Sequence, residues 1–252
     1  MDPQQRAIAE EFDRYRESYD DAVNRAIAFS GQKAEAFTRA KADDLVRTIA
    51  SHFVSPRKLS LLDVGCGIGN YHPFLTPVVG SVSGVDVSSA CIAKAKERNP
   101  SVSYSVYDGS RLPYPDDQFD VTFCICVIHH VPPDRWARFA DEMRRVTRSG
   151  GLIVVYEHNP RHPLTRKVVH DCEFDRDAVL LTMRQTRELL TNAGCSDVAT
   201  ASILTLPPMG GLVEKLDRLF AKLPFGSQYR AVGRVTMTRN SNHFLSPSGD
   251  LS

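Results

Sequence analysis

The stretch Leu61-Leu62-Asp63-Val64-Gly65-Cys66-Gly67-Ile68-Gly69-Asn70 decides the fold of this chain. A short apolar run leads directly into a turn that holds three glycines. Such a turn, between a strand and a helix, lets the backbone approach a ligand closely and points helix N–H groups at it. A dinucleotide site has the spacing GxGxxG, but the sixth position counted from Gly65 is Asn70, so the spacing here is GxGxG. The turn predicts a ligand site after the first strand and leaves the ligand class open.

Two acids further along the chain narrow the ligand class. Asp86 ends the next apolar run, 21 residues after Gly65, and Asp108 ends the run after that. A carboxylate in the first position can accept hydrogen bonds from both hydroxyls of an adenosine ribose, and the second position lies beside the purine. Either acid alone could be a solvated strand end. Their register with the glycine turn favours a ligand that contains adenosine.

Around this turn, short β-branched runs alternate with helical stretches. That alternation is typical of a doubly wound α/β fold, with a mostly parallel sheet and helices on both faces. The expected strands are 61–64, 81–87, 102–107, 119–128, 152–156, 197–204 and 228–237. Helices are expected after the N-caps Ser88-Ser89, between Pro132-Pro133 and a stop at Ser149-Gly150-Gly151, and over 183–192. Residues 158–177 are expected to be irregular.

The chain is predicted to divide into three parts. Residues 1–57 form an N-terminal helical cap of two helices separated near Ser30-Gly31, and 58–237 form the main domain, with a helical insertion near 209–224. The Ser- and Asn-rich tail 238–252 is expected to fray. Glycines and prolines interrupt the uncharged stretch 64–85, which excludes a transmembrane helix there, and the N-terminus has no signal-peptide pattern. Six scattered cysteines favour a reduced, cytoplasmic setting.

Four motifs together resemble the class I S-adenosylmethionine-dependent methyltransferases, in particular those that act on small molecules. They are LLDVGCGIGN at 61–70, GVDVS at 84–88, YDGSRLPYPDDQFDV at 107–121 and CVIHHV at 126–131. The resemblance is strong over 60–157 and weaker beyond. It implies a Rossmann-like methyltransferase fold with seven strands, the last antiparallel, and S-adenosyl-L-methionine as cofactor. It does not identify the acceptor.

The resemblance also implies which residues bind the cofactor. Gly65, Gly67, Gly69 and neighbouring backbone would meet its methionine half, and Asp63, Asp86 and Asp108 would surround the cationic sulfonium compound. Asp86 would hold the ribose, with Val87 against the adenine and Asp108 and Gly109 at the amino edge of the adenine. A backbone carbonyl of Cys124 or Ile125 would meet the methionine ammonium.

Methyl transfer from a sulfonium needs alignment, exclusion of water and, for a hydroxyl or an acidic carbon, removal of a proton. Histidine titrates near neutrality and suits that proton transfer. His130, and less so His129, follows the fourth strand, and Glu157 and His158 follow the fifth. His130, Glu157 and His158 are therefore the candidate catalytic residues, although either histidine of the pair could instead cap a helix or bind backbone.

Other chemistries lack their usual sequence patterns. No His/Cys spacing indicates zinc, and catechol-type transfer would need a set of carboxylates at the active face, so no metal is expected. The cytosine enzymes with this fold use a Pro-Cys nucleophile, which the chain lacks, and the adenine-amino enzymes carry Asn/Asp-Pro-Pro-Tyr where this chain has Ile128-His129-His130. With 31 basic and 30 acidic residues, the chain has no surplus charge to recruit nucleic acid.

Two segments could cover the acceptor. Tyr15 and Tyr19, four residues apart, could form a lid or pack on the sheet. The stretch 212–223 carries six apolar residues on one helical face and could be core, a subunit contact, a roof over a lipid-like acceptor or a peripheral membrane contact.

The sequence therefore predicts methylation of oxygen or carbon on a small acceptor, namely a secondary metabolite, a quinone-like compound, a lipid or a saccharide. Methylation of nitrogen, of protein or of RNA, and a non-catalytic cofactor-binding regulator, are the alternatives. The oligomeric state is left open.

Overall fold

The computed structural model describes Glu10, Asp13, Asn24, Arg25, Ile27 and residues 31–236 apart from 173, 174, 176 and 210. The first predicted helix falls mostly outside the described residues. Tyr15, Tyr19 and the tail 238–252 also lie outside them. The predicted boundaries of the cap and of the insertion remain predictions.

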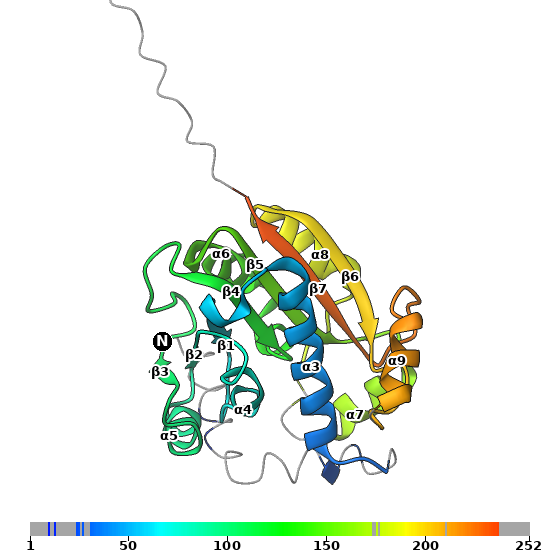
Figure 1. Cartoon of the computed structure of the whole chain (residues 1–252). Coiled ribbons are helices and arrows are strands. Elements are labelled where there is room, and N and C mark those ends of the chain that lie inside the picture. The colour runs from blue at the N-terminus through cyan, green and yellow to red at the C-terminus, as the bar shows by residue number, and fades with distance from the viewer. Residues whose placement is uncertain are drawn as a thin grey trace, which may run out of the picture.

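One seven-stranded sheet organises the chain, and its strands run in the order β3-β2-β1-β4-β5-β7-β6 (Figure 1). Neighbouring strands are parallel except at β7, which is antiparallel to both β5 and β6. This confirms the predicted fold class. The strands are β1 (Ser60–Val64), β2 (Ser81–Asp86), β3 (Ser103–Val106), β4 (Phe119–Ile125), β5 (Thr147–His158), β6 (Cys195–Ile203) and β7 (Gln228–Val235).

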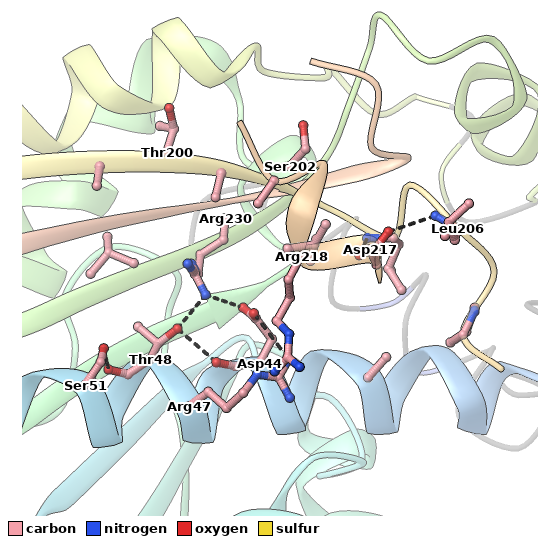
Figure 2. Close-up of a pocket in the computed structure, with 18 of the residues that line it drawn as sticks. Asp44, Arg47, Thr48, Ser51, Thr200, Ser202, Leu206, Asp217, Arg218 and Arg230 are labelled. Atoms are coloured by element: carbon pink, nitrogen blue, oxygen red, sulfur yellow. Dashed lines mark hydrogen bonds and ion pairs between the residues drawn. The ribbon is translucent and has the colours of Figure 1, made fainter. Parts of the chain in front are cut away.

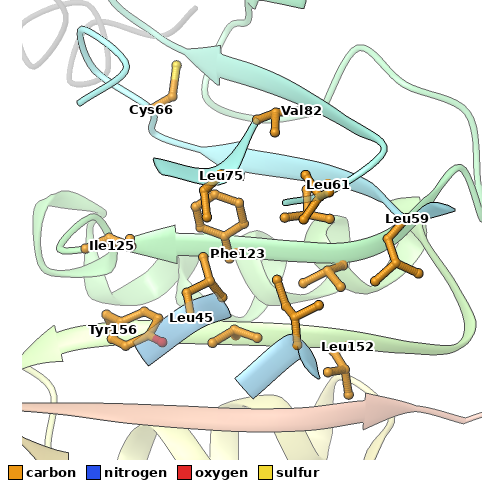
Figure 3. Packing of buried hydrophobic residues seen from close by; sticks show 14 of the residues in the cluster. Leu45, Leu59, Leu61, Cys66, Leu75, Val82, Phe123, Ile125, Leu152 and Tyr156 are labelled. Carbon is orange, nitrogen blue, oxygen red and sulfur yellow. The ribbon is translucent and has the colours of Figure 1, made fainter. Parts of the chain in front are cut away.

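Helices cover both faces of the sheet because both faces of the central strands are apolar. On one face, Leu45 and Ile49 of one helix pack with Leu61, Phe123 and Tyr156 of three strands (Figure 3). The helices of this face are α3 (Ala34–His52), α4 (His72–Leu75) and α5 (Ser89–Arg98). The other face is covered by α6 (Trp136–Val146) and α8 (Met183–Asn192). Two further helices are α7 (Pro163–Asp171) and α9 (Gly211–Leu219), and α9 follows β6 in the chain, beyond the end of that strand (Figure 1).

Three predicted boundaries were wrong, and one helix was not predicted. The helix after Pro132-Pro133 ends at Val146 rather than at the glycines, because Thr147 is already extended and bonds the Met143 carbonyl and the Thr122 hydroxyl, both at 2.6 Å. β5 therefore starts five residues earlier than expected. β4 ends at Ile125 and is followed by a 3-10 turn, Ile128–His130. The segment 158–177 contains α7, whose N-cap is His162.

Candidate active site at the carboxyl edge of the sheet

The glycine turn follows β1 and leans on two neighbouring elements. The N–H groups of Gly65 and Cys66 donate to the Val85 carbonyl at 2.8 and 3.1 Å, which fastens the turn to β2. Gly65 has a φ of +75°, and a Cβ there would lie 2.6 Å from the Val127 methyls. Gly67 has a φ of +52°, but no described atom lies within 4 Å of its Cβ position. Gly65 therefore packs against the loop after β4, whereas Gly67 faces open space.

Asp86, at the end of β2, is buried beside this open space. Its Oδ2 accepts the Gly67 N–H at 2.8 Å, and its Oδ1 accepts the Ser88 N–H at 2.9 Å. Burial raises the pKa of Asp86 to about 6, although both N–H groups favour the charged form. The carboxylate predicted to bind a ribose thus lies against Gly67.

Asp63 and Gly69 lie behind the turn rather than at its open face. Oδ2 of Asp63 is 3.1 Å from Nε2 of the buried His72, whose Nδ1 shares a 2.5 Å hydrogen bond with the Tyr104 hydroxyl. A Cβ on Gly69 would lie 2.5 Å from that same hydroxyl. These contacts give Asp63 and Gly69 a supporting position beneath the predicted cofactor site.

The turn after β3 brings the remaining predicted cofactor residues to this edge. The Tyr107 N–H donates to the Asp86 carbonyl at 3.1 Å, so the 107–109 turn lies beside β2 and Val87. Asp108 is exposed and accepts hydrogen bonds from the Ser110 hydroxyl and the N–H groups of Ser110 and Arg111, which lower its pKa to about 2. Gly109 follows with a φ of +76°. The Cys124 side chain points into the core, which leaves only its backbone for a ligand.

Glu157, at the end of β5, organises the loop after β4. Its Oε1 accepts the N–H groups of Val127 and Ile128 at 3.1 and 2.7 Å, and its Oε2 lies 2.5 Å from Nδ1 of His129. Its side chain is inaccessible. Burial raises the pKa of Glu157, but His129 and His158 outweigh that effect and lower it. This geometry suits positioning of the His129 loop better than the predicted contact of Glu157 with an acceptor.

His129 occupies the centre of a wider polar cluster. Its Nε2 is 3.5 Å from Oδ1 of Asp175, and Nε2 of His130 is 3.3 Å from the same oxygen. The His158 ring lies 5.2 Å from that of His129, centroid to centroid. Burial lowers the pKa of His129, but Glu157 and Asp175 raise it well above its usual value. For His130, burial and the neighbouring His129 lower the pKa.

The structure brings together all three predicted catalytic residues and adds two that the sequence analysis missed or ranked lower. Asp175 lies in a segment predicted to be irregular, with no local motif to mark it. The Val179 N–H donates to the His129 carbonyl at 2.9 Å and brings that segment to the site. His129, given less weight than His130, is the more central residue. The roles of His130, Glu157 and His158 remain predictions.

Lys41 of α3 also reaches this edge. Its Nζ lies 3.9 Å from Sγ of Cys126 and 5.6 Å from the centroid of the Tyr71 ring. Burial lowers the pKa of Lys41, but Cys126 and Tyr71 outweigh it and the net pKa is raised, so the ammonium stays charged. Cys126 has a φ of +58°, which is unusual without glycine and turns the chain sharply after β4. No sequence motif indicated Lys41.

Trp136 anchors the other side of the histidine loop. Its Nε1 donates to the carbonyls of Ile128 and Val131 at 3.1 and 2.8 Å. The loop 127–131 is therefore held by Glu157 on one side and by the indole on the other.

A groove of about 410 Å³ lies between α3 and the outer strands β6 and β7 (Figure 2). Arg230 of β7 points across it to α3, where its Nη1 lies 2.6 Å from both Asp44 Oδ2 and the Thr48 hydroxyl. The Tyr156 hydroxyl donates to the same Asp44 oxygen at 2.9 Å. Arg47 and Arg218 also line the groove. Asp197 and Asp217 line the groove too, so its acids and its arginines are equal in number, three of each.

Comparison with known proteins bears on the part of the chain that builds the turn and strands β1 to β5. Residues 62–155 match the family model of a methyltransferase domain. A 2-methyl-6-phytyl-1,4-hydroquinone methyltransferase of Synechocystis sp. is 36% identical over 110 residues, which cover 42% of this chain and 34% of that protein. A phosphatidylethanolamine N-methyltransferase of Cereibacter sphaeroides is 32% identical over 121 residues, which cover 46% of this chain and 58% of that protein.

A solved methyltransferase from Thermotoga maritima shares the fold over nearly the whole chain. Its TM-score is 0.64 at 18% identity, covering 90% of this chain and 99% of that one. The curated relatives match more closely in sequence, but the matches span about a third to three fifths of their own length.

Proposed function

We propose that this chain, whose residues 62–155 belong to the class I S-adenosylmethionine-dependent methyltransferases, transfers the methyl group of that cofactor to a small, largely apolar acceptor. The observation that carries the proposal is the open face of Gly67 with the buried Asp86 carboxylate against it. A side chain at residue 67 would extend into that open space, and the carboxylate oxygens of Asp86 suit the hydroxyls of a ribose.

The residues of the chain would then divide the task as follows. The bound cofactor supplies a methyl group already activated on a sulfonium. Asp86 accepts the ribose hydroxyls, and the Gly65–Gly67 backbone lies against the methionine part. Glu157 and Trp136 hold the histidine loop in place, and His130 in that loop is placed to take a proton from a hydroxyl acceptor.

Support for an apolar acceptor comes from the 209–225 apolar surface, which we define as Met209, Leu212, Leu216, Leu219, Phe220, Leu223 and Phe225. Each of these side chains is exposed by 38% or more. The segment is tied to the carboxyl edge, because Nδ2 of Asn159 donates to the Pro224 and Gly226 carbonyls at 3.1 and 2.8 Å. Two relatives carry names of lipid or prenyl-quinol methyltransferases, which agrees with such an acceptor. No described helix is long and apolar enough to span a membrane.

Calorimetric titration with S-adenosylmethionine, followed by an assay of S-adenosylhomocysteine release with a panel of quinols, lipids and phenols, tests the proposal. We expect cofactor binding by the wild type, and weakening of about tenfold or more in Asp86→Asn. Asp134→Asn, at an exposed acid far from the glycine turn in sequence, is the control and should bind normally. Absence of cofactor binding in the folded wild type would refute the proposal. Binding without turnover of any acceptor would favour a regulator.

A further inference from the structure

We propose that His129, His158 and Asp175 form a binding site for one divalent transition-metal ion at the carboxyl edge of the sheet. One ring nitrogen of each histidine and one oxygen of Asp175 lie within 4.8 Å of one another. Two imidazoles and a carboxylate are a donor set that zinc, cobalt and iron(II) accept readily. This departs from the sequence-based expectation of no metal, because the three ligands come from three separate segments and have no ligand spacing.

The observation that points to a ligand is a buried ring nitrogen of His129. Its side chain is 1% exposed, and its Nε2 makes no hydrogen bond with any described residue. The nearest acid oxygen, Oδ1 of Asp175 at 3.5 Å, is too distant for a good N–H···O bond. Two ligands on a tetrahedral ion, with bonds of about 2.1 Å, lie about 3.4 Å apart. The distance of 3.5 Å between Nε2 of His129 and Oδ1 of Asp175 is therefore too long for a good hydrogen bond, but it matches the distance between two ligands of one metal ion.

The other ring nitrogen of His129 is fixed in the way that metal-bound histidines usually are. Nδ1 lies 2.5 Å from Oε2 of Glu157, and a carboxylate on the far nitrogen orients the ring and raises its basicity as a ligand. Glu157 is in turn fixed by the two backbone N–H groups of Val127 and Ile128. The buried Glu157 thus has a role as a positioning residue that needs no contact with the acceptor.

Charge also favours a cation here. The carboxylates of Glu157 and Asp175 lie 2.5 and 3.5 Å from the two ring nitrogens of His129, and an ion bound at Nε2 would take the place of the proton that these acids otherwise favour. Lys41 is the charged ammonium at the same edge. His158 is less buried than His129; its Nδ1 lies 3.4 Å from Nε2 of Gln228, and its ring also hydrogen-bonds the Cys126 thiol. A three-ligand site keeps open positions for water or an acceptor oxygen; that use rests on the proposed methyl transfer, whereas ion binding does not.

Cobalt(II) and zinc are suitable probes, used on full-length chain that carries no histidine tag and has been treated with chelator. We expect one ion per chain by elemental analysis, and a visible cobalt(II) spectrum typical of low coordination number. His129→Ala and Asp175→Asn should weaken zinc binding at least tenfold, and Glu157→Gln by about ten- to a hundredfold. His170→Ala is the matched control, because its side chain is 88% exposed and outside the cluster, and it should leave binding unchanged.

Circular dichroism and cofactor titration on the same samples separate the outcomes. If His129→Ala fails to fold, Asp175→Asn and His158→Gln provide the comparison. Sub-stoichiometric binding by the wild type, or equal zinc affinity in the ligand variants and in His170→Ala, would overturn the proposal. Normal cofactor binding with no ion would reject the metal site alone and leave the proposed function standing.

Discussion

Two glycines of the same turn face different surroundings, and substitution should separate their roles. Gly65→Ala must accommodate a methyl group 2.6 Å from Val127 in addition to an unfavourable φ, whereas Gly67→Ala meets only the backbone strain. We expect Gly67→Ala to lose roughly 1 kcal/mol of stability and Gly65→Ala clearly more, by denaturant unfolding. Cofactor affinity should fall in both.

Val127→Ala provides the control for this pair. Removing the Val127 methyls should recover part of the stability lost in Gly65→Ala, and none of that lost in Gly67→Ala. Equal stability losses for the two glycine variants, with no rescue, would contradict the packing assigned to Gly65.

Asp86 should give cofactor affinity and protein stability opposite dependences on pH. Its pKa is about 6 in the fold and 3.8 without it, so between these values the folded chain binds more protons than the unfolded chain. The contribution of Asp86 to stability therefore falls as pH rises from about 4 to 6, by at most roughly 3 kcal/mol. Cofactor affinity should rise over the same range, because the ionised carboxylate is the better acceptor for ribose hydroxyls.

Calorimetry and urea unfolding at pH 5 and pH 8, on wild type and Asp86→Asn, measure both trends. In Asp86→Asn, cofactor affinity and stability should both lose the pH dependence that comes from Asp86. A wild-type affinity that does not change across pH 6 would argue against an ionised Asp86 on the ribose.

At the scale of single residues, the sequence predicted where Asp86 lies, but it predicted neither the position of Asp175 nor the burial of Glu157. The distance from Gly65 to Asp86 is set by one β-helix-β unit, so spacing alone placed the carboxylate beside the turn. Asp175 reaches His129 through a loop that is held by tertiary contacts, and no local pattern encodes such a contact. The burial of Glu157 likewise depends on how the β4 loop folds over it.

Among the elements, α3 is held to the sheet by a buried charge cluster rather than by apolar packing alone. Asp44→Ala would remove the partner of Arg230 and of the Tyr156 hydroxyl and leave the guanidinium partly buried without its carboxylate. We expect a loss of about 2–3 kcal/mol in urea unfolding, because both side chains are still partly solvated.

Arg47→Ala serves as the comparison for that variant. Arg47 pairs with the same aspartate at 3.5 Å, but its side chain is 40% exposed, so its removal should cost less than about 1 kcal/mol. Equal losses for Asp44→Ala and Arg47→Ala would show that the Arg230 contact contributes little.

α9 and the residues on either side of it present the 209–225 apolar surface next to Lys215, Arg218 and Lys222, a combination that suits an anionic lipid surface. The double variant Leu212→Gln, Leu219→Gln should reduce flotation with phosphatidylglycerol vesicles several-fold and leave cofactor affinity unchanged. Deleting 209–224 would be less informative, because Asp217 accepts the Leu204 and Leu206 N–H groups and its loss would disturb the fold.

Val54→Gln is the matched control for vesicle binding, since Val54 is also a fully exposed apolar residue but lies just after the C-terminal end of α3, outside the 209–225 apolar surface. Unchanged flotation of the double variant would contradict a membrane contact. Normal flotation with lost turnover of a soluble acceptor would instead support a roof over the acceptor.

Over the whole molecule, the sequence predicted the strands well because alternation of apolar runs and helices is a local signal. Most strand boundaries were placed within a few residues, and the antiparallel β7 followed from the resemblance to methyltransferases. The early start of β5 was missed because Ser149-Gly150-Gly151 is also a common helix stop, and only the pairing of Thr147 with Phe119 shows that it lies within a strand. α7 was missed because its His162 cap is not a usual one.

The two hydrogen bonds of Trp136 give the molecule an optical reporter. The chain has one tryptophan, so fluorescence excited at the red edge of its absorption arises from a single indole. That indole is bonded to the loop carrying His129 and His130 and lies partly exposed. Occupation of the site by cofactor, acceptor or metal ion can thus be followed through the native emission, with no attached dye.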